Sequence, residues 1–181
     1  MRKSIPIIIA LLLLILCCRG IIYRLLIKYK AVGTRAGIEI TNPDLIEQIE
    51  LESGDEVMTI AQIAKIADGI TSRQLSFTGG KASNNPNELM VLGQANCIGY
   101  SAMFHAIASH LIKKYHLDNE IISTHKIGQM ELLGVDIHQF FDHTFFRDHD
   151  YNVLSNTKTG KSIAVDPSVS DYLWIKRIAE Y

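Results

Sequence analysis

Residues 94–115 read QANCIGYSAMFHAIASHLIKKY and carry the strongest secondary-structure signal in the chain. From Tyr100 onward, apolar side chains recur at three- and four-residue steps, which predicts an amphipathic helix over residues 96–115. Asn96 belongs to the residue types that favour the N-cap position of a helix. Cys97 would therefore lie in the first turn of this helix, at the head of its apolar face.

The segments on either side of this helix differ in pattern. Before it, Asn42-Pro43-Asp44 predicts a helix start with Asn42 as N-cap, and the apolar spacing of residues 56–67 predicts a second helix. After it, β-branched and aromatic residues predict strands at 120–126, 141–147, 151–154 and 162–165. Helices that precede strands in this way indicate an α+β fold with an antiparallel sheet.

The N-terminal segment is apolar and has basic residues on both sides. Residues 5–18 are uncharged, and extension to residue 27 reaches the length of a membrane span but includes two arginines. Since no small-x-small cleavage site follows, we expect an uncleaved signal anchor in residues 5–27 and an extracytoplasmic domain. A cleaved signal peptide and a lipid on Cys17 or Cys18 are the alternatives.

Charge is distributed unevenly along the chain. Six of the 18 basic residues lie in residues 1–30, where no acidic residue occurs, so the remainder carries 12 basic and 19 acidic side chains. A basic N-terminal segment suits an anionic lipid surface. An acidic domain without a basic stripe argues against nucleic-acid binding. We expect an anchor or signal peptide at 1–30, a linker at 31–41 and one domain at 42–181.

Cys97 is the only cysteine outside the first eighteen residues. A disulfide would need a partner from the apolar N-terminal run, and zinc would need several ligands close together, whereas the histidines are scattered. We therefore expect neither a metal nor a cofactor. A buried core thiol and a nucleophile remain. The nucleophile is favoured because the free N–H groups and the dipole at a helix start stabilise the thiolate, which is the reactive form.

A nucleophilic cysteine needs a base and a group that orients the base. His143 lies in the strand-like stretch FDHTFF, and Asp166 follows another strand in IAVDPS. If these strands are neighbours, both side chains can lie at the start of the helix. We predict a triad of Cys97, His143 and Asp166, and the alternative bases are His125, His138 and His149.

The motifs around these residues resemble those of the transglutaminase-like superfamily, within the broad papain-like fold. In that family a cysteine opens a helix in a Cys-x-Gly-Tyr-like setting, and CIGY at 97–100 is similar. HTFF at 143–146 and VDPS at 165–168 resemble the histidine and aspartate motifs, in the same order. The resemblance covers about residues 90–170. The chain departs from the family's usual tryptophan or glycine at Gln94, Asp142, Phe145 and Phe146.

The resemblance implies acyl transfer through a thioester. Cys97 would attack an amide carbonyl, His143 would take the thiol proton and return it to the leaving amine, and Asp166 would orient the imidazole. The backbone N–H of Cys97 and a side chain, Gln94 or else Asn96, would hold the oxyanion. Water or an amine would then resolve the thioester.

Two functions follow as expectations. The first is a membrane-anchored cysteine-dependent amide hydrolase or acyltransferase that acts on a protein or peptide. The second is a catalytically inactive domain of the same fold that serves as a binding or assembly module.

Overall fold

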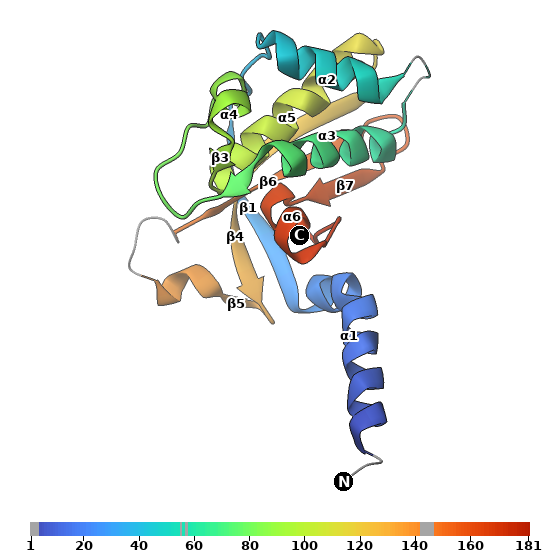
Figure 1. Ribbon diagram of the computed structural model, residues 1–181, viewed down its shortest axis with the longest axis vertical. Helices are drawn as coiled ribbons and strands as arrows, with labels where there is room; N and C mark the ends of the chain where they lie inside the picture. The colour runs from blue at the N-terminus through green and yellow to red at the C-terminus, as the bar shows by residue number, and fades with distance from the viewer. Residues whose placement is uncertain (1–3, 55, 57, 142–146) are drawn as a thin grey trace.

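An antiparallel sheet with helices packed on one face forms the centre of the molecule (Figure 1). The computed structural model describes the backbone of residues 4–54, 56, 58–141 and 147–181, and the side chains from residue 13 onward. The elements in chain order are α1 (Ser4–Leu26), β1 (Ile27–Arg35), α2 (Pro43–Ser53), α3 (Ile60–Gln74), β2 (Ser76–Phe77), α4 (Pro86–Leu92), β3 (Gln94–Ala95), α5 (Cys97–Lys114), β4 (Ile121–Leu132), β5 (Val135–Asp136), the 3-10 helix η1 (Ile137–Phe140), β6 (His149–Asn156), β7 (Ser162–Val165) and α6 (Pro167–Leu173).

Two predicted helix starts are confirmed by their caps. The side chain of Asn42 accepts hydrogen bonds at the start of α2, and the side chain of Asn96 accepts from the N–H groups of Ile98 and Gly99 at the start of α5. These bonds satisfy N–H groups that have no partner within the helix. The predicted helix over residues 96–115 is therefore present nearly in full.

The second predicted helix is displaced along the chain. α3 spans Ile60–Gln74 rather than 56–67, because Thr59 and Gln62 form a capping box that fixes its start. The helix continues through Gly69, beyond the predicted end at residue 67. One glycine costs a helix about 1 kcal/mol, and burial of the apolar face of α3 offsets that cost.

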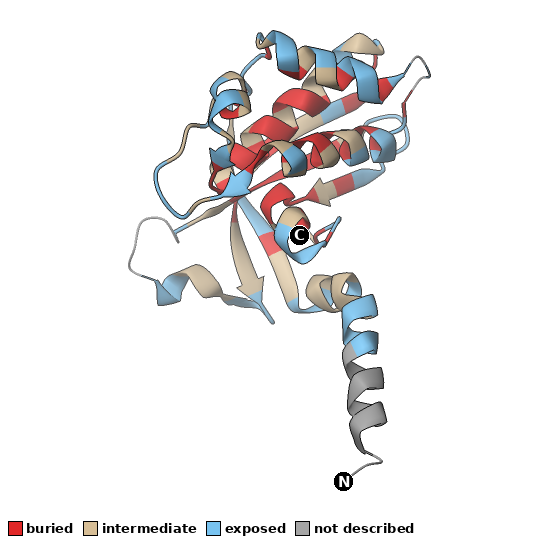
Figure 2. Cartoon of the chain, in the orientation of Figure 1, coloured by how far each residue is buried: buried red, intermediate tan, exposed pale blue. Residues whose placement is uncertain are grey.

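The main sheet has five strands in the order β1-β4-β6-β7, with β5 paired to β4, and all of these pairs are antiparallel. α5 and α3 lie against one face, and the buried residues gather along them and the strands beneath (Figure 2). The predicted α+β fold with an antiparallel sheet is confirmed. A separate parallel pair, β2 and β3, leads into α5.

Strand β1 corrects the predicted domain boundaries. Residues 31–35, expected in a linker, pair with β4 in the sheet. Between Ala31 and Gly33 the register shifts, so Val32 is an extra residue and forms a bulge. As a result, Tyr29 before the bulge and Arg35 after it pair with β4 residues that lie on opposite faces of the sheet.

The predicted membrane anchor in residues 5–27, with its extracytoplasmic domain, is contradicted. Within the described residues, no helix combines the length and the apolar character that crossing a membrane requires. The end of the segment is part of the domain instead. Arg19 Nε donates to the carbonyl oxygen of Leu173 at 3.1 Å, the hydroxyls of Tyr23 and Tyr29 lie 2.7 Å apart, and the chain enters β1 at residue 27.

Candidate active site

Cys97 is the first residue of α5, as the sequence predicted, and only 6% of its surface is exposed. The turn that holds it is tightly packed. A Cβ added at Gly99 would lie 2.7 Å from the Cβ of Ala95 and 2.8 Å from the carbonyl oxygen of Ser83, so the loop before α4 lies directly against this turn. Glycine is needed at position 99 for this close approach.

Asp166 is fully buried where β7 ends and α6 begins. Its Oδ1 caps α6, accepting from the N–H groups of Ser168 and Val169 at 3.1 Å and from the Ser168 hydroxyl at 2.7 Å. Its Oδ2 lies 2.5 Å from Nε2 of His149, the first residue of β6. The cap therefore fixes the carboxylate, and the carboxylate fixes the imidazole.

His149 connects Asp166 to the cysteine. Burial by itself lowers the pKa of His149, but the charge of Asp166, the hydrogen bond to it and a side-chain hydrogen bond with Cys97 together raise that pKa well above its usual value. Burial by itself raises the pKa of Asp166, but the charge and hydrogen bond of His149 and the bonds of the α6 cap hold it below its usual value. These shifts favour the protonated form of His149 and the ionised form of Asp166, with the side chain of Cys97 beside the imidazole.

The position of His149 follows from the register of the sheet. β6 and β7 pair Asn152 with Val165, so Asp166 comes level with residue 151. His149 lies on the same side of β6 as residue 151, diagonally across from Asp166. His143, the predicted base, lies outside the described residues. His149 was an alternative base in the sequence analysis, and extension of the predicted strand 151–154 backwards by two residues is the signal that would have favoured it.

The two remaining alternative bases, His125 and His138, belong to β4 and η1. His125 is buried, and its Nε2 lies 2.7 Å from Oδ2 of Asp150. Arg35 donates to both oxygens of the same carboxylate, which is fully buried. Its hydrogen bond to Asp150 raises the pKa of Arg35, and Cys97 adds a smaller electrostatic contribution in the same direction.

The two predicted oxyanion donors lie immediately before α5. Gln94 is exposed on β3, and Asn96 is buried. Oδ1 of Asn96 accepts from the N–H groups of Ile98 and Gly99, which fixes the orientation of its side-chain amide. The N–H of Cys97 has no hydrogen-bond partner within the described part of the chain, as expected for the first residue of a helix.

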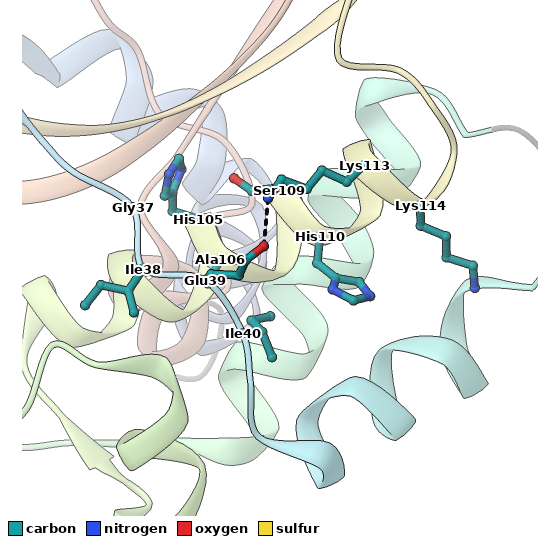
Figure 3. A pocket seen from close by; sticks show the side chains of 10 residues that line it. All are labelled: Gly37, Ile38, Glu39, Ile40, His105, Ala106, Ser109, His110, Lys113 and Lys114. Carbon is teal, nitrogen blue, oxygen red and sulfur yellow. Dashed lines mark hydrogen bonds and ion pairs between the residues drawn. The ribbon is translucent and has the colours of Figure 1, made fainter.

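A cavity of about 530 Å³ lies away from these residues, between the segment Gly37–Ile40 and α5 (Figure 3). Two lysines of α5 line it, and each pairs with a glutamate, Lys113 with Glu39 and Lys114 with Glu50. Across the described residues, no cluster of three or more histidine, cysteine or acidic side chains could hold a metal ion.

Comparisons with known proteins provide no relative. No family model, no curated protein and no solved structure matches this chain. Its function must be inferred from the residues and the geometry described above.

Proposed function

We propose that the chain is a cysteine-dependent acyl-transfer enzyme, an amide hydrolase or acyltransferase, that acts through Cys97, His149 and Asp166. The observation that carries this proposal is the imidazole of His149, 2.5 Å from the fully buried carboxylate of Asp166, with the thiol at the N-terminus of α5 among the groups that raise the pKa of that imidazole. His149 takes the role that the sequence assigned to His143.

In this proposal, protonated His149 stabilises the thiolate of Cys97. The thiolate attacks the carbonyl carbon of an amide, an S–C bond forms, and the electron pair of the C=O bond moves to oxygen. The imidazolium then donates its proton to the leaving nitrogen as the C–N bond breaks, which leaves a thioester. Neutral His149 removes a proton from water or an amine, which attacks the thioester and releases the thiolate.

The oxyanion would accept hydrogen bonds at the start of α5. The backbone N–H of Cys97 is one proposed donor, since α5 leaves it free. The side chain of Gln94 is the other, because it is exposed next to this turn. Asn96 is the weaker candidate, since its residue is buried and the cap fixes the orientation of its amide, whose Nδ2 would be the donor.

The resemblance to the transglutaminase-like superfamily supports the same chemistry. CIGY at 97–100 and VDPS at 165–168 supply two of the three proposed groups. A helix that begins at the cysteine and packs on an antiparallel sheet agrees with the papain-like core that the resemblance implies. We propose a protein or peptide amide as the substrate.

One observation favours the inactive binding module. Cys97 is only 6% exposed, so a substrate carbonyl could reach the sulfur only along a narrow approach. The reactivity of the thiol separates the two functions, because an inactive domain needs no reactive thiolate.

Alkylation by iodoacetamide tests the proposal. Cys17 is exposed and Cys18 is partly exposed, so both are first replaced by serine and only Cys97 can react. At neutral pH we expect His149→Ala to slow alkylation by about 10-fold or more, because the thiolate loses its cationic partner. His143→Ala is the matched control and should leave the rate unchanged.

The outcomes divide the alternatives. If Cys97 reacts only after unfolding, the binding module is supported and the enzyme is excluded. If His143→Ala slows the reaction and His149→Ala does not, the base is His143. A covalent acyl-enzyme, captured from peptide thioesters, detected by mass spectrometry and absent in Cys97→Ala, would support acyl transfer to Cys97.

A further inference from the structure

The carboxylate of Asp166 has a second partner on the oxygen that faces His149. The hydroxyl of Tyr29, in β1, donates to Oδ2 at 2.8 Å, and Tyr29 is fully buried. Its ring also packs edge-on against the imidazole of His149, with ring centroids 6.0 Å apart. One tyrosine thus contacts both the proposed base and the carboxylate that orients it.

The hydrogen bonds continue from Tyr29 to the N-terminal helix. The hydroxyl of Tyr23, in the last turns of α1, lies 2.7 Å from that of Tyr29. A carboxylate can only accept, so Tyr29 donates to Asp166 and accepts from Tyr23. Burial raises the pKa of both tyrosines, which keeps both hydroxyls protonated and able to donate.

We propose that Tyr29 is a positioning residue of the active site, which holds Oδ2 of Asp166 and sets the basicity of His149, and that Tyr23 acts through Tyr29. This inference rests on the proposed function. The hydroxyl shares Oδ2 with the imidazole and withdraws negative charge from it. Removal of the hydroxyl leaves a more strongly negative oxygen against His149, so the protonated imidazole is stabilised further.

Several titratable groups lie beside the hydrogen-bonded residues Tyr23, Tyr29, Asp166 and His149. Cys97 faces His149 from α5, and Tyr151 of β6 packs on Tyr29 with ring centroids 5.2 Å apart. Tyr151 donates to Glu180 at 2.7 Å, and within the described residues no hydrogen bond joins its hydroxyl to Asp166. It is as fully buried as Tyr29, so its hydroxyl is a matched control for removal of a buried hydroxyl.

The test is the titration of His149, followed by NMR in the full-length chain. The resonance is assigned by its loss in His149→Gln. We expect Tyr29→Phe to raise the pH midpoint of His149 by about half a unit or more, and Tyr151→Phe to leave it in place. The alkaline transition in the pH profile of Cys97 alkylation should move in the same direction.

A double substitution tests whether Tyr23 acts on His149 through Tyr29. Tyr23→Phe should shift the midpoint in the same direction by less than Tyr29→Phe. Because Tyr23 acts only through Tyr29, the double variant should match Tyr29→Phe alone. Additive shifts would overturn the assignment of Tyr23.

The positioning role of Tyr29 and the enzymatic function proposed for Cys97 can be refuted independently. The NMR midpoint does not require a reactive thiol, so a shift specific to Tyr29→Phe supports the inference even if Cys97 proves unreactive. If Tyr29→Phe and Tyr151→Phe both lower stability and neither moves the midpoint, Tyr29 is only a structural residue and the inference is overturned.

Discussion

Substitution of two helical glycines tests how tightly the turn around Cys97 is packed: Gly99 lies in that turn, and Gly69 in α3 serves as the comparison. Gly99→Ala places a Cβ 2.7 Å from the Cβ of Ala95, 2.8 Å from the carbonyl oxygen of Ser83 and 3.3 Å from Cδ1 of Leu89. The first two neighbours are a backbone atom and an atom fixed to the backbone, so neither can rotate away. In Gly69→Ala the new Cβ meets Nη1 of Arg73 at 3.3 Å, the end of a flexible side chain.

These distances predict opposite effects of the glycine-to-alanine substitution on the stability of the protein at the two positions. Either substitution gains about 1 kcal/mol of helix propensity. Overpacking against backbone costs about 3 kcal/mol, at the upper end of its usual range. Gly99→Ala should therefore destabilise the protein by about 2 kcal/mol, whereas Gly69→Ala should stabilise it by up to about 1 kcal/mol.

Urea unfolding of both variants, followed by circular dichroism, measures the difference. Alkylation of Cys97 in the folded Gly99→Ala protein should also change, because the turn that holds the sulfur must move. The reasoning is refuted if Gly99→Ala is as stable as Gly69→Ala, since the first turn of α5 would then not lie against the loop at Ser83.

Three further predictions concern buried charges, each measured by urea unfolding. The lowered pKa of Asp166 stabilises the fold above about pH 4, and this contribution is lost as pH falls through the lowered value. Asp166→Asn should therefore cost about 2–3 kcal/mol at neutral pH and much less in strong acid. The raised pKa of His149 acts in the opposite sense: its stabilisation is complete below about pH 6.5 and is lost as pH rises through the raised value, so the deficit of His149→Gln should shrink in alkali. Arg35→Met leaves the buried Asp150 without its guanidinium and should cost about 3 kcal/mol, and Arg35→Lys should restore only part of this because lysine cannot bind bidentately.

The sequence predicted those parts of the site that depend on local signals. The N-cap at Asn96 and the apolar spacing of α5 were sufficient to place Cys97 in a first turn. Asp166 was recognisable because it stands between a strand and a proline, and the structure makes it the N-cap of α6.

The partner of that aspartate depends on the pairing of strands. Which histidine lies across from Asp166 is decided by the register that joins Asn152 to Val165, and flanking aromatic residues carry no information about register. Tyr29 was missed for a related reason. The alternation of apolar and charged residues in IKYK, at 27–30, is a strand signal, but these residues had been assigned to the membrane anchor.

Because of the bulge at Val32, side chains of β1 bind buried carboxylates on both faces of the sheet. Side chains alternate along a regular strand, so Tyr29 and Arg35, an even number of residues apart, would otherwise share a face. With the bulge, Tyr29 reaches Asp166 on one face and Arg35 reaches Asp150 on the other. Loss of a single residue from β1 would turn one of them away from its carboxylate. Length variation is usually tolerated at the margin of a sheet, but here it would separate either Asp166 from Tyr29 or Asp150 from Arg35.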